Sequence, residues 1–268
     1  MAPDVRLIAL DLDGTLLNPQ NRVSDEDAAA VRDAVSAGLT VVFATSRWHQ
    51  AARRTALSLG LDGFIISHNG ALVRSCDGSR ELLHHRIEQH LARSIADHID
   101  ALDGDAYVTV EDRTYVRSSR PRDASRMPPD MTQSASLSEA LWSAPTAFLL
   151  FGQDSVRSTV ERFSGHHGKG LNLAEGFSGS FPDYLNIVHA AADKGRALAA
   201  VCSELGIPLA AAMAIGDAAP DIAMIEVAGI GVAMGNAAPA LKSAADAIAP
   251  SNSESGVAWA IRCFALAG

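Results

Sequence analysis

Two carboxylates follow the first apolar segment of this sequence at a spacing that can serve chemistry. The apolar run Val5–Leu10 leads into DLDGT at residues 11–15, and it predicts a buried parallel strand. Residues i and i+2 leave the same side of a strand, so Asp11 and Asp13 should meet at its carboxyl end, where open α/β sheets bind ligands. Two close carboxylates repel unless a cation lies between them or one keeps a proton. Mg²⁺ is the cation we expect, since it prefers oxygen ligands and is commonly held by carboxylates together with substrate phosphate.

Taken alone, this acid pair is weak evidence for a site. A lone DxD segment is more typical of an acidic turn at a strand end, and Gly14 suits such a turn. A calcium loop of the EF-hand type starting at Asp11 is excluded, because Leu16 stands where that loop requires glycine. A functional site therefore needs matching groups elsewhere in the chain.

A second apolar segment ends in acidic residues in the same way. The run Ala211–Ile215 leads to Gly216 and Asp217, and Asp221 follows after Pro220. We expect Asp217 to project from the same sheet edge as Asp11. Pro220 fits the first position of a helix, and an acid beside it favours the helix N-terminus. On their own, these two acids would merely cap that helix.

A hydroxyl and a lysine complete the set. Thr45 follows the apolar run 39–44, and Lys194 begins an Ala-rich helix. Only three of the 22 basic residues are lysines, and a cation at a helix N-terminus opposes the helix dipole, so we interpret Lys194 as functional. These groups follow successive elements of the predicted sheet. Together, the acid pair, the hydroxyl, the lysine and the second set of acids would form a charged site suited to phosphoryl transfer. A metal and a lysine would neutralise the phosphate while a carboxylate attacks it.

Alternating strands and helices must bring these residues to one edge. In the N-terminal third, expected strands at 5–10, 39–44 and 64–67 alternate with expected helices, and the C-terminal third from residue 194 repeats the pattern. This spacing predicts a parallel sheet with right-handed crossovers. Residues 84–188 differ in composition and periodicity. We therefore predict an α/β protein with a Rossmann-like parallel-sheet core, residues 1–83 and 189–268, interrupted by an inserted α+β domain, residues 84–188.

In order and spacing, the motifs resemble those of the haloacid-dehalogenase superfamily. The matching segments are DLDGTL at 11–16, ATSR at 44–47, NGA at 69–71, KG at 194–195, GDAAPD at 216–221 and VAMGNA at 232–237. The long insertion is similar to that of the Cof-like phosphatases, whose α/β cap domain lies between the second and third motifs and sets substrate specificity. The resemblance implies a Mg²⁺-dependent phosphatase acting on a small phosphorylated metabolite, with a sugar phosphate as the first candidate. A phosphomutase and a non-catalytic sugar-phosphate sensor are the alternatives.

The resemblance also implies a role for each matching residue. Asp11 would be the nucleophile that forms an aspartyl-phosphate, and Asp13 would protonate the leaving oxygen and then activate the water. Thr45 and Lys194 would bind phosphoryl oxygens. The magnesium ligands would be the Asp11 carboxylate, the Asp13 main-chain carbonyl and Asp217, with Asp221 in support. The further substrate-binding residues that we expect are Gly14, Ser46, Arg47 and Asn69.

The sequence departs from the family pattern at two of these motifs. Pro220 stands where the family usually has asparagine, which puts support of the metal site in doubt, and Ser46 replaces a usual glycine, which adds a side chain near the phosphate. No expected metal ligand or phosphate-binding group is lost, so we expect catalysis to be retained, if weakened.

The overall charge limits the partners. With 22 basic and 31 acidic residues the net charge is −9, so we expect neither nucleic-acid nor anionic-membrane binding, both of which need a basic face. Three widely spaced cysteines indicate reduced thiols, and we expect a cytoplasmic monomer or homodimer. The nine histidines predict surface or cap residues rather than zinc ligands. The arginine-rich stretch 117–126 either meets an anionic substrate or forms a solvated loop.

Overall fold

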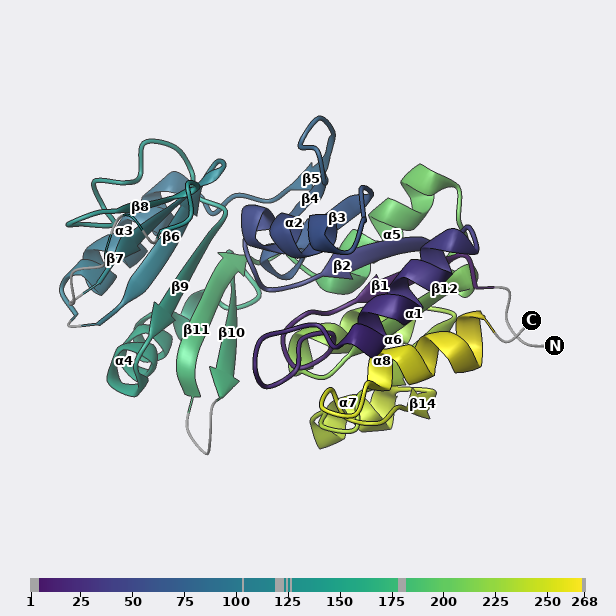
Figure 1. The fold of residues 1–268 in the computed structure, drawn as a ribbon. Helices are drawn as coiled ribbons and strands as arrows, with labels where there is room; N and C mark the ends of the chain where they lie inside the picture. Colours follow the sequence, from purple (N-terminus) through teal and green to yellow (C-terminus); the bar gives the residue numbers. More distant parts are fainter. Residues whose placement is uncertain are drawn as a thin grey trace. The chain divides into compact units, whose positions relative to one another are not determined.

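The chain forms two compact units. The structure, a computed structural model, describes residues 5–266 except 103, 119–122, 124, 126 and 178–181. The first unit, which we call the core unit, contains residues 1–83 and 193–268, and the second, the inserted unit, contains residues 84–192 (Figure 1). The inserted unit spans residues 84–192, compared with the range 84–188 expected from the sequence. Residue 188 lies inside a strand, Pro182–His189, whose pairing continues to His189.

The core unit is built on a mostly parallel sheet. Over the described residues it has eight strands, in the order β14-β13-β12-β1-β2-β3-β4-β5. Their bounds are β1 Leu7–Leu10, β2 Thr40–Ala44, β3 Phe64–Ser67, β4 Leu72–Ser75, β5 Glu81–His84, β12 Ala212–Gly216, β13 Ile230–Ala233 and β14 Ala247–Ile248. The strands from β14 to β3 pair in parallel, and β4 turns back to pair antiparallel with β3. The expected parallel sheet is thus confirmed, and β4, β5 and β14 extend it at the two edges.

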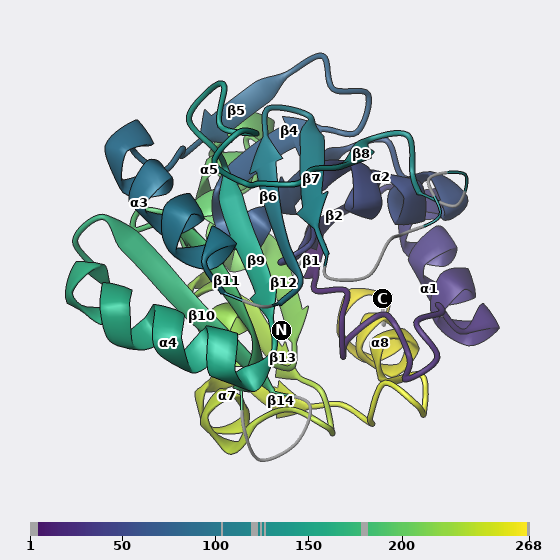
Figure 2. The same ribbon diagram turned by 90° about the vertical axis from the view of Figure 1, so that its left-hand side faces the viewer.

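Helices cover both faces of this sheet. They are α1 Asp25–Ser36, α2 His49–Ser58, α5 Lys194–Leu205, α6 Ile222–Val227, α7 Pro239–Ala244 and α8 Gly256–Ala260. α1 packs against α8, and α5 packs against α6. The connections from β1 to β2 and from β12 to β13 run outward from β1 in opposite directions, which for right-handed crossovers places their helices on opposite faces. In Figure 2, α1 and α8 lie on the opposite side of the core sheet from α5. α8 ends at Ala260, and the chain continues as a wider π-helical turn, Ile261–Ala265.

Burial on both faces explains the sequence of the central strands. All four residues of β1 are fully buried, and β12 is buried along its whole length. A strand covered on both faces shows a continuous apolar run rather than alternation. The polar residues that follow these strands therefore stand out, because they begin where the apolar core ends.

The inserted unit has its own sheet and its own core. Over the described residues its six strands lie in the order β10-β11-β9-β6-β7-β8. Their bounds are β6 Ala106–Val110, β7 Arg113–Arg117, β8 Met131–Gln133, β9 Ala147–Phe151, β10 Leu171–Phe177 and β11 Pro182–His189, and the helices are α3 Gln89–Asp100 and α4 Gln153–Phe163. Val108, Phe148 and Ile187 are among the buried residues of its separate core. α3 and α4 lie together on one side of this sheet (Figure 2). The expected fold class, an α/β core with an α+β insertion, is confirmed.

Within the described residues, no helix combines the length and apolar character needed to cross a lipid bilayer.

Candidate active site

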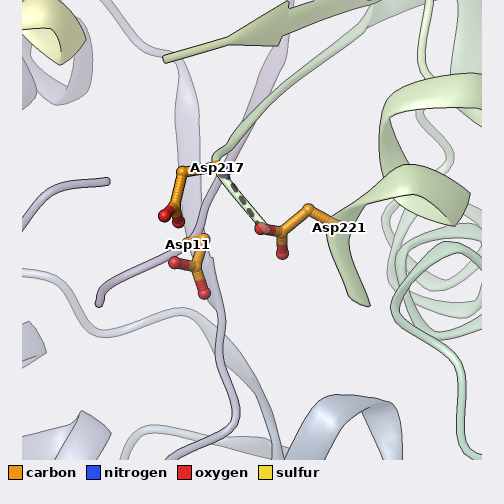
Figure 3. A group of neighbouring side chains, drawn as sticks. All are labelled: Asp11, Asp217 and Asp221. Atoms are coloured by element: carbon orange, nitrogen blue, oxygen red, sulfur yellow. Dashed lines mark hydrogen bonds between the residues drawn. The ribbon is translucent and has the colours of Figure 1, made fainter. Parts of the chain in front are cut away.

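Asp11 and Asp217 lie close together because the strands that carry them are paired. β1 and β12 run parallel, and the Asp11 N–H continues the pairing by donating to the Ile215 carbonyl at 3.0 Å. Both carboxylates therefore leave the carboxyl ends of neighbouring strands, and Asp221 joins them from the turn that follows β12. One carboxylate oxygen from each of the three lies within 4.8 Å of the others, a group able to hold a metal ion (Figure 3).

Lys194 ties this acidic group to the start of α5. Its Nζ donates to Asp11 Oδ1 at 2.8 Å and to Asp221 Oδ1 at 2.5 Å, and its side chain is only 3% exposed. The Asp193 side chain caps the same helix by accepting from the Arg196 N–H. A cation at a helix N-terminus opposes the dipole, so the two carboxylates are what hold a lysine at this position.

Negative charge exceeds positive charge in this cluster. Burial raises the pKa of Asp11 well above its ordinary value, although Lys194 opposes the shift. Burial, and then the charge of Asp221, raise the pKa of Asp217 to about 7. Burial alone would lower the pKa of Lys194, but attraction by Asp11 and Asp221 outweighs it and raises that pKa. Three carboxylates around one lysine therefore favour the uptake of a further cation or a proton.

Asp217 and Asp221 are held in different ways. Asp221 Oδ2 accepts from the backbone N–H groups of Asp217 and Ala218, at 3.1 and 3.0 Å, while its Oδ1 binds Lys194. This carboxylate is therefore committed to closing its own turn. Over the described residues, the Asp217 side chain accepts only a hydroxyl hydrogen bond, from Thr15 at 3.1 Å, so its oxygens are the more available to a cation.

The two departures from the family pattern fit into this geometry without displacing it. Pro220 lies in the 3₁₀ turn Ala219–Asp221, directly before α6, where a proline suits the first turn of a helix. The carboxylate of Asp221 keeps its backbone contacts without an amide side chain at position 220. Ser46 is half-buried in the segment after β2.

Gly14 is required by its approach to Asp217. It adopts φ +84°, and a Cβ on it would lie 2.2 Å from Asp217 Oδ2, so only glycine fits here. We expected Gly14 to contact substrate, and the structure shows in addition that it packs against an acid of the cluster. Its carbonyl accepts from Asn236 Nδ2 at 2.8 Å, which fixes the loop after β1 to the segment after β13.

Asp13 points its carboxylate at an arginine. Arg47 donates through Nε to Asp13 Oδ2 at 2.7 Å and through Nη2 to Asp13 Oδ1 at 2.6 Å. The side chains of Arg47 and Asp13 are 28% and 43% exposed, respectively, which contrasts with the buried Lys194. The Asp13 side chain is therefore separate from the group of three carboxylates.

Thr45, Arg47 and Asn69 are linked through the backbone that follows β2 and β3. Thr45 Oγ1 accepts from the Arg47 N–H at 3.1 Å, and the Thr45 carbonyl accepts from the Asn69 N–H at 3.0 Å. Asn69 is 5% exposed, and its Oδ1 has no hydrogen-bond partner among the described residues. Gly70 passes so close to Asp193 that a Cβ would lie 2.4 Å from its carbonyl oxygen. These contacts place the expected phosphate-binding segment beside the N-terminus of α5.

Three residues of the site's scaffold had no role in the sequence analysis. Thr15 binds Asp217, and Asn236 binds Gly14. Asn252 donates from its backbone to Asn236 Oδ1 at 2.9 Å and from its side chain to the Leu17 carbonyl at 2.8 Å. Thr15 and Asn236 belong to the recognised motifs, which was a usable signal. Asn252 lies outside the motifs that were recognised in the sequence.

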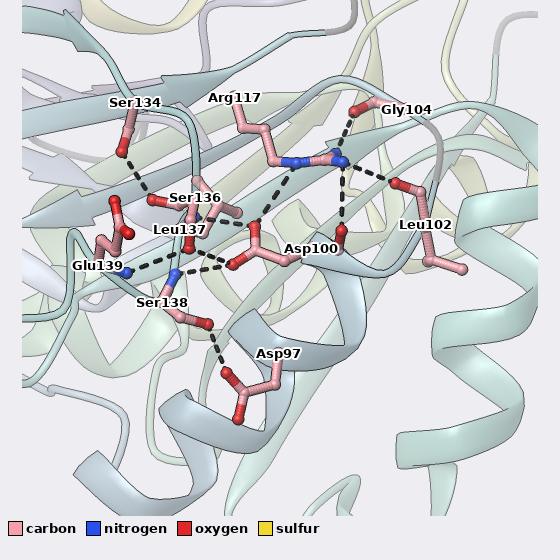
Figure 4. Close-up of polar contacts among 10 residues, drawn as sticks. All are labelled: Asp97, Asp100, Leu102, Gly104, Arg117, Ser134, Ser136, Leu137, Ser138 and Glu139. Carbon is pink, nitrogen blue, oxygen red and sulfur yellow. Dashed lines mark hydrogen bonds and ion pairs between the residues drawn. The ribbon is translucent and has the colours of Figure 1, made fainter.

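Arg117, the first residue of the arginine-rich stretch, stabilises the fold of the inserted unit. Arg117 donates to the carbonyls of Asp100, Leu102 and Gly104 and lies 3.6 Å from the Asp100 carboxylate (Figure 4). It satisfies the carbonyls at and just after the end of α3, so Arg117 is held by the fold of the inserted unit and does not belong to a solvated loop. Arg120, Arg122 and Arg126 lie outside the described residues.

Known proteins resemble this chain along nearly its full length. The family model of the haloacid dehalogenase-like hydrolases matches residues 8–261. A 5-amino-6-(5-phospho-D-ribitylamino)uracil phosphatase of Bacillus subtilis is 33% identical, over 98% of this chain and 97% of its own. The phosphatase YwpJ of the same organism is also 33% identical, over 95% of this chain and 98% of its own. The solved structure of a haloacid dehalogenase-like hydrolase from B. subtilis superposes with a TM-score of 0.81 at 28% identity, covering 96% of this chain and 99% of that one.

The match of the family model and the identity to these phosphatases agree with the resemblance of the motifs. The chain therefore belongs to the haloacid dehalogenase-like hydrolases, as a phosphatase of the Cof-like type.

Proposed function

We propose that this protein is a Mg²⁺-dependent phosphatase that hydrolyses a small phosphorylated metabolite through an aspartyl-phosphate on Asp11. The observation that carries the proposal is the buried contact of Lys194 with Asp11 and Asp221 beside Asp217. A sugar phosphate is the first substrate class to test. The name of the relative that acts on a phosphorylated ribitylamino-uracil adds a phosphorylated sugar-alcohol chain to that class.

Asp11 is suited to be the nucleophile. Its side chain is buried, and Lys194 binds Oδ1, which leaves Oδ2 to attack phosphorus. In the first step an Asp11–phosphorus bond forms and the bond to the leaving oxygen breaks, while Asp13 gives that oxygen its proton. In the second step water attacks the same phosphorus atom, Asp13 takes the proton from the water, and the bond to Asp11 breaks. Asp13 is exposed and can therefore serve both a leaving group and a water.

The donor set fits Mg²⁺. All of the side-chain donors are carboxylate oxygens, one from each of three residues within 4.8 Å, and their negative charge exceeds that of the neighbouring lysine. Asp11, Asp217 and the Asp13 main-chain carbonyl would hold the ion, with Asp221 beside them. When bound, the ion would supply the positive charge that lets two anions, Asp11 and a phosphate ester, approach each other.

The remaining polar groups would bind the phosphoryl oxygens. Thr45 Oγ1 accepts from the Arg47 N–H, so its own O–H remains able to donate to a phosphoryl oxygen. Lys194 would contribute its charge. Ser46 lies next to Thr45 in the chain, and the Asn69 N–H donates to the Thr45 carbonyl, so we propose that Asn69 contacts the phosphate or the leaving group. The core unit would carry the chemistry, and the inserted unit, as the cap domain, would set substrate preference.

A screen of phosphorylated metabolites tests this function. Sugar phosphates, pyridoxal phosphate, flavin and nucleotide monophosphates and an aryl phosphate would be incubated with Mg²⁺, with Asp11→Asn as the blank. We expect phosphate release by the natural chain from at least one ester and none by Asp11→Asn. Transfer of the phosphate within the substrate, with none released, would indicate a phosphomutase. Tight binding of an ester without turnover would indicate a sensor.

A further inference from the structure

Arg47 and Lys194 differ in how firmly they are held. Lys194 is buried and contacts two carboxylates. Arg47 is 28% exposed, and Asp13 is its one ion-pair partner among the described residues. Ion pairs open to water contribute little net free energy, so an incoming anion can displace Asp13 from Arg47 far more easily than it can displace two acids from Lys194.

The Arg47–Asp13 ion pair also keeps Asp13 from its proposed role at the leaving group. Arg47 occupies both carboxylate oxygens of Asp13, yet the proposed chemistry needs one of those oxygens at the leaving group. Asp13 therefore has to leave Arg47, at least in part, when substrate binds. Such a change leaves a guanidinium without its partner.

Arg47 stands where a phosphate would be its next partner. Its backbone N–H binds the Thr45 hydroxyl oxygen, and its hydrogen bond with Asp13 and the charges of Asp13 and Asp11 raise its pKa, so it stays cationic beside the nucleophile. The planar fork of a guanidinium matches phosphate oxygens as well as carboxylate oxygens.

We propose that Arg47 is a positioning residue with two alternating partners, the Asp13 carboxylate in the substrate-free enzyme and a phosphoryl oxygen of the bound substrate. The inference rests on the proposed function and deepens it, because phosphate binding then frees the Asp13 carboxylate to take a proton from solvent and to pass it to the leaving oxygen. The same fork serves both anions, so Asp13 and phosphate compete for it. Arg47 would thus couple arrival of the phosphoryl group to release of the acid.

A double-mutant cycle on phosphate binding tests the competition. The dissociation constant of inorganic phosphate would be measured by calorimetry in the presence of Mg²⁺ for the natural chain, Asp13→Ala, Arg47→Ala and the double variant. We expect Asp13→Ala to tighten binding about tenfold when Arg47 is present, and at most about threefold when it is absent, since the second effect is only the loss of a repelling charge. We expect Arg47→Ala alone to weaken binding about tenfold.

Arg53→Ala is the matched control. Arg53 is a half-buried arginine of the same unit, but its Nε donates to the Cys76 carbonyl instead of an acid. Arg53→Ala changes the net charge by the same amount as Arg47→Ala. We expect Asp13→Ala to tighten phosphate binding in the Arg53→Ala variant as much as it does in the natural chain. A lysine at position 47 should recover part of the phosphate affinity because it restores the charge without the fork.

Two outcomes would overturn the proposal. One is an equal effect of Asp13→Ala with and without Arg47, and the other is a natural chain that binds no phosphate in the presence of Mg²⁺. A KM that stays constant while kcat falls in Arg47→Ala would also count against it, because exchange predicts a KM increase larger than the fall in kcat. Phosphate binding needs no turnover, so failure of this cycle is distinct from failure of the proposed function, which is judged by ester hydrolysis and its loss in Asp11→Asn.

Discussion

Two aspartate clusters in this molecule have opposite electrostatics. In the inserted unit, burial would raise the pKa of Asp100, but hydrogen bonds from the Leu137 and Ser138 N–H groups and from the hydroxyls of Ser136 and Ser138 outweigh it, and the pKa is lowered (Figure 4). In the core unit, burial raises the pKa of both Asp11 and Asp217.

The difference lies in the supply of donors. Asp100 accepts from Leu137 at 2.9 Å, Ser138 at 3.0 Å and the Ser136 hydroxyl at 2.7 Å, and Arg117 balances its charge. Asp11, Asp217 and Asp221 share one buried lysine. The Asp100 cluster, whose acceptors and charge have partners within the protein, stabilises the fold. The core cluster has an excess of negative charge and is therefore suited to bind a cation or a proton.

The largest effect on stability is expected from removing the cation of the core cluster. Lys194→Met leaves Asp11 and Asp221 buried without a counter-charge, which should lower the free energy of unfolding by about 3–5 kcal/mol. Loss of its contact to the phosphoryl group should lower kcat by about 10²–10³-fold. Urea unfolding and phosphate release measure the two effects. Since Mg²⁺ supplies positive charge at the same acids, it should recover part of the lost stability, and no recovery would count against a shared site.

The next effect concerns Asp217 and pH. Its pKa in the folded protein, about 7, lies above the ordinary aspartate pKa of 3.8, so the contribution of this group to the stability of the metal-free protein is greatest below about pH 4 and is lost as pH rises towards about 7. Asp217→Asn should flatten this loss. Protons also compete with the metal, so Mg²⁺ affinity should fall by about tenfold per pH unit below about 7. Calorimetric titration with Mg²⁺ from pH 5 to 8 measures this slope, and an affinity independent of pH would contradict the assignment.

The satisfied cluster should respond in stability rather than in activity. Asp100→Ala removes an acceptor of several hydrogen bonds and the partner of Arg117, and we expect a loss of about 2–4 kcal/mol in the unfolding of the inserted unit. Asp97→Ala is the matched control, because Asp97 accepts one hydroxyl hydrogen bond from Ser138 at an exposed position and should cost less than about 1 kcal/mol. Equal losses of unfolding free energy in the two variants would show that the hydrogen bonds of Asp100 do not specifically stabilise the inserted unit.

A small effect is expected from the scaffold of the site. Asn236→Ala removes the contacts to the Gly14 carbonyl and to the Asn252 N–H and should lower kcat/KM by about 3–10-fold, with about 1–2 kcal/mol lost in stability. Asn18→Ala is the comparison, since Asn18 lies in the same loop and binds only local backbone, the N–H groups of Gln20 and Arg22. Its kcat/KM should be near that of the natural chain. A similar loss of kcat/KM in both variants would show that Asn236 acts only through the general stability of the loop.

The sequence predicts most of the core's framework, for a physical reason. Strands buried on both faces are continuous apolar runs, so β3, Phe64–Ser67, matches the strand expected at 64–67 residue for residue. β4 was missed because Arg74 and Ser75 interrupt its apolar character, although both are buried, with Arg74 paired to Glu81. β14 has only two residues, too few for a periodic signal.

The same limit applies to the site. Acids and lysine at strand and helix ends were predictable, because the ends of parallel strands share an edge, and the structure brings Asp11, Asp217, Asp221 and Lys194 together. The periodic pattern of a strand does not predict the direction in which an exposed side chain points. The Asp13–Arg47 pair and the bridge through Asn236 and Asn252 therefore emerge only from the three-dimensional structure.

The comparison of the two aspartate clusters is tested most directly by measuring Asp11→Asn and Asp100→Asn side by side. For each variant, Mg²⁺-dependent phosphate release from a small aryl phosphate and the free energy of unfolding without metal would be determined. Asp11→Asn should abolish release and keep or increase stability, because it removes a charge from an overcharged cluster. Asp100→Asn should keep release from this small ester and lose stability. Phosphate release that survives in Asp11→Asn would contradict the account.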